Sequence, residues 1–234
     1  MEKMLVNNQE TSIPSGVILP GSIYREIWEL FALIFTLTFT FTIPYQISFS
    51  NKDITVSRFL IDALMDGFFA FDVYSQLNKF AVMKDGHLLS DPVEFRKLYL
   101  KGEFRGDFIS ILPISTIFFF IQIRDKRYGI FRLLQLTRVR RFGTYLDRFV
   151  EACKTRANVS ISTAVMRIFQ IFFIVLFLCH WFACTYHFIG VSSSSSITWL
   201  HKDESLSELM ITRYIRSFFW ALYTGEFLQT FQDT

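Results

Sequence analysis

Side chains that can carry or pair with charge recur at every third position in "GIFRLLQLTRVRRFGTYLDR", residues 129–148. Three are arginines, Arg132, Arg138 and Arg141, and Gln135 keeps the interval. Steps of three advance by about 300° around an α-helix, so the four positions form one slowly turning stripe. Three arginines carried through a membrane field would exchange on the order of 7 kcal/mol per 100 mV. This pattern indicates voltage sensing, and the alternative is an amphipathic helix lying on anionic lipid.

Three carboxylates in the neighbouring apolar segments favour the membrane interpretation. Asp66 and Asp72 lie in one such segment and Asp107 begins another. Unpaired charges are costly at membrane depth, so a buried arginine stripe needs partners of this kind. Phe69 lies about one turn before Asp72 on the same helical face, which predicts a ring beside a carboxylate. Taken alone, Asp72 is equally well explained as a structural ion pair.

The elements that must position these side chains are predicted to be helices that cross a membrane. Five stretches have suitable length and composition, although the second also carries Asp62; they are residues 30–49, 59–82, 108–123, 129–148 and 168–191. A shorter apolar stretch, "MITRYIRSFFWALYTGEF", suits a re-entrant helix better than a full span. The fold class is therefore all-α and polytopic.

Loop charge predicts an orientation for these spans. The loop between the second and third spans is rich in lysine and arginine, and so is the segment after the fourth. The loops after the first and fifth spans are much less basic. By the positive-inside tendency, the N-terminus and the two basic loops are expected in the cytoplasm.

Composition excludes several other classes of protein. With 51% hydrophobic residues and 29 Phe, the chain is too apolar for a typical soluble domain, and its net charge of +3 predicts no nucleic-acid partner. We find no hydrolase or zinc-protease motif, so neither an enzyme nor a metal or cofactor site is predicted. A transporter is disfavoured because the chain does not divide into two corresponding halves with broken helices. The three cysteines are expected to be buried hydrophobic side chains.

The ordered set of motifs resembles the voltage-sensor and pore region of the cyclic-nucleotide-gated, hyperpolarisation-activated and EAG-like group of cation channels. The similarity covers roughly residues 20–224, and its most specific part is "DGHLLSDP" followed by "YLKGEFRGDFISILP". Other matching pieces are "REIWELF", "DGFFAFD", "FRLLQLTRVRRF" and "CHWFACTYHFIG". The family therefore implies a four-helix voltage sensor followed by part of a pore domain.

The resemblance also implies roles for single residues. Arg132, Arg138 and Arg141 correspond to the family's voltage-sensing arginines. The charge-transfer site, which the arginines pass, corresponds to four residues: Asp66, Phe69, Asp72 and Asp107. In the fifth helix the "HW" pair is His180 and Trp181, and we expect His180 to be a hydrogen-bonded packing residue rather than a ligand.

The resemblance predicts that the chain consists of four segments. They are a cytoplasmic tail (1–21), the voltage sensor (22–149), a cytoplasmic linker (150–161) and a partial pore domain (162–234). The partners implied are potassium or sodium ions, membrane lipid and further channel subunits, in a homotetramer or heterotetramer at the plasma membrane. Cyclic nucleotide would bind only through a domain that is absent from this chain.

The pore region departs from the family pattern. Potassium-selective members place a Thr-x-Gly-Tyr/Phe-Gly filter about nine residues after the pore-helix tryptophan, here Trp220, because backbone carbonyls must replace the ion's hydration shell. Here Thr224, Gly225 and Glu226 resemble the Thr-x-Gly-Glu ending of weakly selective filters, about four residues too early. The sequence stops at Thr234, before a sixth helix. We therefore expect a voltage-gated cation channel subunit, with potassium favoured, or a truncated, non-conducting regulatory subunit that assembles with full-length relatives.

Overall fold

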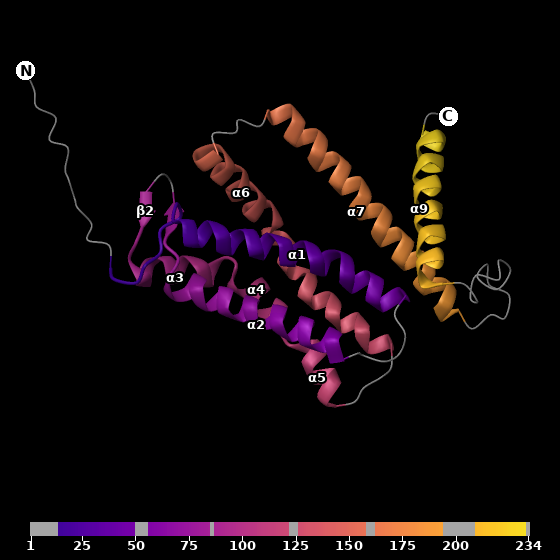
Figure 1. Ribbon diagram of the computed structural model, residues 1–234, viewed down its shortest axis with the longest axis horizontal. Helices are drawn as coiled ribbons and strands as arrows, with labels where there is room; N and C mark the ends of the chain where they lie inside the picture. The colour runs from indigo at the N-terminus through magenta and orange to yellow at the C-terminus, as the bar shows by residue number, and fades with distance from the viewer. Residues whose placement is uncertain are drawn as a thin grey trace, which may run out of the picture.

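The computed structural model describes residues 14–49, 56–84, 87–121, 126–157, 162–193 and 209–232, which are mostly helical (Figure 1). The helices are α1 (Ile23–Phe49), α2 (Val56–Asn78), α3 (Pro92–Lys101), α4 (Phe104–Ser110), α5 (Ile114–Phe120), the 3₁₀ helix η1 (Lys126–Arg141), α6 (Phe142–Ala157), α7 (Thr163–Ser192) and α9 (Met210–Gln232). The all-α expectation is confirmed. Between α2 and α3 the chain also forms a short antiparallel pair of strands, β1 (Val82–Lys84) and β2 (His87–Leu89).

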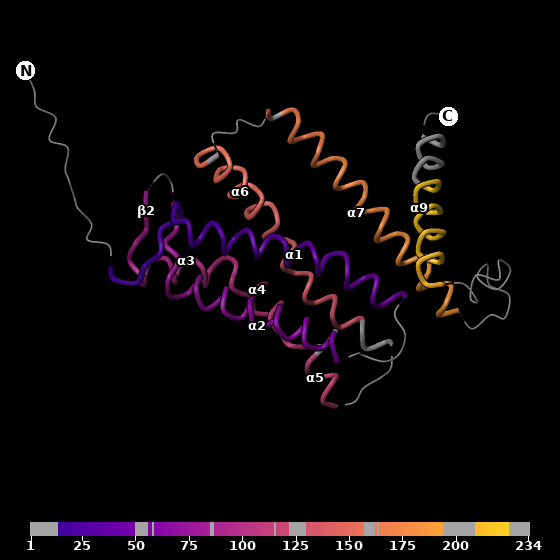
Figure 2. The backbone as a smooth tube through the Cα atoms, in the orientation of Figure 1, coloured from indigo at the N-terminus to yellow at the C-terminus, as the bar shows by residue number. Residues whose placement is uncertain are grey.

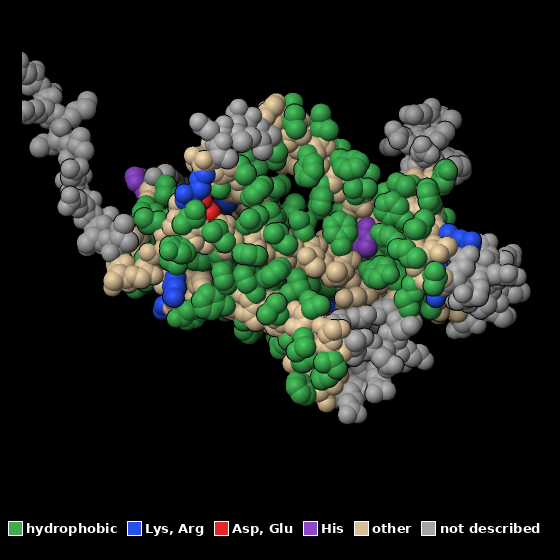
Figure 3. Space-filling view, viewed as in Figure 1, with side chains coloured by type: hydrophobic (Ala, Val, Ile, Leu, Met, Phe, Trp, Pro, Cys, Tyr) green, Lys and Arg blue, Asp and Glu red, His purple; other side chains and the backbone are tan. Residues whose placement is uncertain are grey.

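Within the described part of the chain, two helical segments are long and apolar enough to cross a membrane by length and composition, residues 23–49 and 164–192. The other expected spans are interrupted or carry charged side chains in their interior, as α2 does with its three aspartates. Figure 3 shows hydrophobic side chains over most of the visible face of the molecule, with charged side chains mainly toward its ends. This surface is what a chain surrounded by lipid requires.

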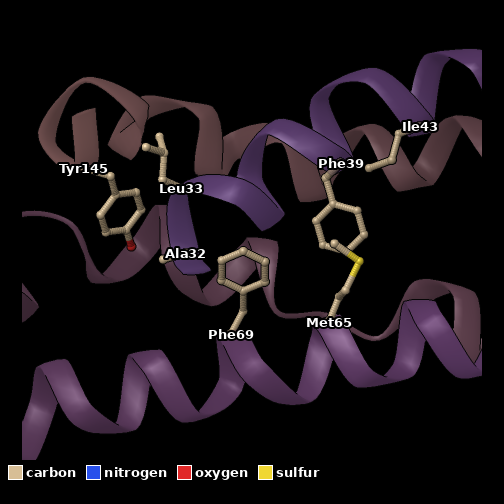
Figure 4. Packing of buried hydrophobic residues seen from close by; sticks show 7 residues of the cluster. All are labelled: Ala32, Leu33, Phe39, Ile43, Met65, Phe69 and Tyr145. Atoms are coloured by element: carbon tan, nitrogen blue, oxygen red, sulfur yellow. The ribbon is translucent and has the colours of Figure 1, made fainter. Parts of the chain in front are cut away.

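Aromatic packing joins α1 to α2 and forms the core of the helical bundle. The rings of Trp28 and Phe68 stack at 4.2 Å between centroids, and those of Phe39 and Phe69 at 5.9 Å. The buried cluster comprises Ala32, Leu33, Phe39, Ile43, Met65, Phe69 and Tyr145. Figure 4 shows Phe69 pointing from α2 toward α1. In lipid such close packing, rather than exclusion of water, holds helices together.

The third expected span, 108–123, is not one helix. The structure has α4 ending at Ser110 and α5 beginning at Ile114, with Pro113 immediately before it. Proline has no backbone N–H to donate and restricts the residue before it, so the break falls where the sequence places proline. As a result α4, which carries Asp107, forms a separate short helix packed against η1.

The arginine stripe lies on a 3₁₀ helix, not on the α-helix that we expected. η1 covers Lys126–Arg141, and α6 begins at Phe142, so the expected helix over 129–148 is two elements. A 3₁₀ helix has about three residues per turn, which brings residues three apart into line. The stripe is therefore straight rather than slowly turning, and all four of its side chains are buried.

After η1 the chain reverses direction between α6 and α7, and α7 packs against both α1 and α9 (Figure 2). His180 on α7 is a hydrogen-bonded packing residue, as expected. Its Nδ1 lies 2.9 Å from Tyr214 Oη of α9, and its Nε2 lies 2.9 Å from the Phe41 carbonyl oxygen of α1. α6 continues through the expected sensor–linker boundary at residue 149, and the four segment boundaries stay predictions.

Candidate voltage-sensing site

Arg132 forms the first contact of the stripe, at the end of the bundle where α1 ends and α2 begins. Its Nη2 lies 3.0 Å from Asp62 Oδ2 of α2, and its guanidinium also donates to the side-chain oxygen of Gln46 on α1. Asp62 was noted in the sequence as a charge within the second expected span but was not predicted as a site residue. Because it lies one helical turn from Asp66, the spacing of four could have placed it on the same face.

Gln135 occupies the second position of the stripe and is almost completely buried. Its Nε2 donates to Asp66 Oδ1 at 3.0 Å. A neutral amide therefore satisfies one oxygen of a carboxylate that the sequence analysis had paired with arginines. Asp66 therefore lies against the stripe, but its hydrogen-bond partner is the one uncharged member, and its charge-transfer role stays a prediction.

Arg138 lies at the centre of the site, against Phe69. Its guanidinium carbon is 3.7 Å from the ring centroid, which is a close cation–π contact. Arg138 Nε donates to Ser110 Oγ at 2.8 Å, and Nη2 donates to the Ser110 carbonyl oxygen at 2.6 Å. Phe69 from α2 and Ser110 from α4 thus hold this arginine from two sides. The sequence predicted Phe69 but gave no signal for Ser110.

Arg141 ends the stripe among three carboxylates. Its Nη2 lies 2.8 Å from Asp107 Oδ2, its Nε 2.6 Å from Glu103 Oε2, and its Nη1 3.7 Å from Asp72 Oδ2. Asp72 and Asp107 are buried, whereas the Glu103 side chain is 54% exposed. The predicted pairing of arginine with these two aspartates is present in the structure, and Glu103 was missed because it lies in a polar stretch.

Neutral donors orient the two buried aspartates. Trp28 Nε1 donates to Asp72 Oδ1 at 2.7 Å, and the Tyr99 hydroxyl donates to Asp107 Oδ2 at 2.7 Å. Burial, and next the charge of Asp107, raise the pKa of Tyr99 above its usual range, so its hydroxyl keeps the proton that it donates. These contacts fix the carboxylates where an arginine can meet them.

Removing the Tyr99 hydroxyl tests this support. We expect Tyr99→Phe to lower the free energy of unfolding by about 1–2 kcal/mol, because the buried Asp107 Oδ2 loses one of its two donors and keeps only Arg141. A denaturant titration in detergent micelles measures the change. Tyr24→Phe is the matched control, since Tyr24 is 80% exposed and should change stability little. Equal effects of the two substitutions would show that the hydroxyl does not support Asp107.

A second cluster of charged side chains lies where α1 begins, next to α6. Arg25 is 1% exposed, its Nε donates to Glu29 Oε1 at 2.8 Å, and its Nη1 donates to the Ala81 carbonyl oxygen. Arg148 of α6 pairs with the same oxygen of Glu29. Further along, Arg156 pairs with Glu26. These ion pairs fasten α6, and with it the end of η1, to α1.

The expected pore residues lie apart from this site, on α9. That helix extends from Met210 to Gln232, longer than the re-entrant helix expected from the sequence. The ring of Trp220 stacks on Tyr186 at 3.7 Å, and Thr224 Oγ1 donates to the Trp220 carbonyl oxygen at 2.9 Å, as within an ordinary helix. Gly225 and Glu226 also fall within the bounds of α9, whereas a selectivity filter is an extended segment. The assignment of Thr224, Gly225 and Glu226 to a filter therefore stays a prediction.

Among the described residues, no group of three or more His, Cys, Asp or Glu side chains could hold a metal ion. The arrangement on η1 can instead exchange charge partners. Each member of the stripe faces a carboxylate or the Phe69 ring. One three-residue shift along the axis would place each side chain where its neighbour now lies.

The sequence is matched over residues 25–233 by the family described as "Ion transport protein". It is 28% identical over 219 residues to the potassium voltage-gated channel protein eag of Drosophila melanogaster, covering 91% of this chain and 17% of that protein. It is 24% identical over 224 residues to the potassium channel AKT1 of Arabidopsis thaliana, covering 93% and 25%.

A third relative is the potassium/sodium hyperpolarization-activated cyclic nucleotide-gated channel 2 of Mus musculus. The identity is 28% over 200 residues, which cover 78% of this chain and 23% of that protein. The chain thus spans a quarter or less of the length of these relatives. By their names all three are channels rather than enzymes.

Proposed function

Because this chain belongs to the ion transport protein family and is a multi-pass membrane protein, we propose that it supplies the voltage sensor and part of the pore of a voltage-gated cation channel. Potassium is the first candidate ion, since two of the named relatives are potassium channels. Four such subunits would surround one pore, as a homotetramer or heterotetramer at the plasma membrane.

The observation that carries this proposal is the buried stripe on η1. Arg132, Arg138 and Arg141 project from one line of a 3₁₀ helix and meet Asp62, Phe69 and Asp107 respectively. A cytoplasmic amphipathic helix would instead leave such side chains in contact with lipid headgroups or water. Buried arginines with buried partners favour a sensor within the membrane.

The site supports movement by exchange of partners. When η1 shifts by three residues, an arginine leaves one carboxylate and passes Phe69 before reaching the next. The ring offers a cation–π contact along the way, so the guanidinium keeps a favourable partner between the two carboxylates. Each elementary charge that crosses the full field exchanges roughly 2.3 kcal/mol per 100 mV, which is enough to couple η1 to a conformational equilibrium.

The test is voltage clamp of membranes that carry the protein, with potassium and sodium exchanged in turn. We expect a gating charge that moves with voltage, followed by a cation current through the assembled pore. Absence of any gating charge, with the protein present at the cell surface, would overturn the proposal.

A second candidate is a non-conducting regulatory subunit that joins other channel subunits. It is favoured by the helical backbone through residues 224–226, where a conducting filter needs carbonyl groups free to face the ion. Under this alternative the gating charge is present, no current flows from the chain alone, and co-expression with a conducting relative alters that relative's current.

A further inference from the structure

The second position of the arginine stripe carries no charge. Gln135 is 1% exposed and is bound to Asp66, while the positions on either side of it hold guanidinium groups. If the basic loops face the cytoplasm, the direction from Arg138 to Arg141 points inward. One inward step of three residues therefore brings Gln135 to the place beside Phe69 that Arg138 now occupies.

In the present state Arg138 closes this place tightly. Its guanidinium lies 3.7 Å from the Phe69 centroid and is bonded to Ser110. A cavity of about 10 Å³ remains beside it, room for about one water molecule. Thr36 Oγ1 and Arg138 Nη1 are buried next to this cavity, and neither has a hydrogen-bond partner among the described residues. The place beside Phe69, called the constriction below, is therefore narrow, but part of its lining is polar.

Glutamine would close the same place less well than arginine does. Its side chain is shorter and ends in an amide, so the volume now filled by the guanidinium becomes available to water. It also carries no positive charge to repel a cation. Asp66 lies on one side of the constriction, and Asp72 and Asp107 lie on the other, so carboxylates flank the path in both directions.

On the inner side the path would open into a larger space. A cavity of about 260 Å³ is lined by Tyr99, Glu103, Arg141, Tyr145 and Arg148, among others. Arg141 and Tyr145 line this cavity and the small one beside Phe69 alike. A cation that passed Phe69 would thus reach the larger cavity past these two side chains.

We propose that the sensor itself conducts small monovalent cations in the state in which Gln135 lies beside Phe69. This leak is separate from the pore to which α7 and α9 contribute, and it rests on the proposed function only for the voltage-driven movement of η1. It is limited to a window of intermediate voltages, because a further step in either direction returns an arginine to the constriction.

The experiment is voltage clamp of the chain with guanidinium as the probe cation and N-methylglucamine as a cation too large to pass. We expect a guanidinium current in the unaltered chain over the intermediate window. Gln135→Arg and Gln135→Lys should reduce this current at least about tenfold, because a fixed positive charge then occupies the narrow site. Gln135→Asn, which stays neutral, should keep it. Gating charge is recorded from the same membranes.

The gating charge separates the possible outcomes. A gating charge without guanidinium current in the unaltered chain overturns the leak and leaves the proposed function standing. A current that persists in both charged variants also overturns the leak, because the ions then pass elsewhere. If no variant shows gating charge, the proposed sensor fails and the leak fails with it. Having two charged variants covers the case in which one of them does not reach the membrane.

Discussion

Replacing Arg138 with glutamine is expected to lower the gating charge by up to about one elementary charge per chain, the largest functional effect that we predict for a single side chain. Arg138 is 5% exposed, and its guanidinium lies 3.7 Å from the centroid of the Phe69 ring. If η1 moves past this ring, the field acts on Arg138 during the first step in either direction. Integrating the gating current under voltage clamp measures the change directly.

Arg140→Gln is the matched control for this substitution. Arg140 lies two residues along the same helix and has the same chemistry, but it is exposed and outside the stripe. Its Nε donates only to the Thr137 carbonyl oxygen, at 3.2 Å, among the hydrogen bonds of the described residues. The control should therefore leave the gating charge nearly unchanged. Equal losses from the two substitutions would mean that position in the stripe does not decide which arginine senses the field.

The sequence alone was sufficient to place the central members of the site. Arginines at intervals of three, together with aspartates in neighbouring apolar segments, are costly in a membrane unless they meet. That argument predicted Asp72 and Asp107 near the stripe, and the structure has Arg141 between them. Phe69 followed from its spacing to Asp72 on one helical face. These inferences depend on local periodicity and on the cost of burial, both of which a single sequence reveals.

What the sequence could not predict depends on tertiary contacts. The choice of a 3₁₀ helix over an α-helix is set by the partners of the stripe on α2 and α4, since intrinsic preference does not favour a 16-residue 3₁₀ run. Ser110 and Gln46 became visible only once their helices were packed against η1. The extent of α9 was underestimated because apolar length, and not helical continuity, was used to bound it.

The second large effect that we expect is a loss of unfolding free energy when Asp107 is replaced with asparagine. Asparagine keeps the shape and can still accept from Tyr99, but it removes the charge that lies 2.8 Å from Arg141 Nη2. Breaking a buried ion pair by neutralising one partner costs about 3–5 kcal/mol, because the remaining charge is left poorly compensated. We expect a loss near the lower end of that range, about 3 kcal/mol, since Asp72 and Glu103 still face Arg141. A denaturant titration in detergent micelles measures it.

Glu103→Gln tests whether burial or distance decides this cost. Glu103 lies closer to Arg141 than Asp107 does, at 2.6 Å from Nε, yet its side chain is 54% exposed, against 6% for Asp107. Water already solvates the exposed carboxylate, so its ion pair should contribute only about 0–1 kcal/mol. If distance governed the energy, Glu103→Gln would be the more destabilising substitution. The order that we expect is the reverse, because the field of a buried charge is poorly screened and, of these two carboxylates, Asp107 is the one that water cannot reach.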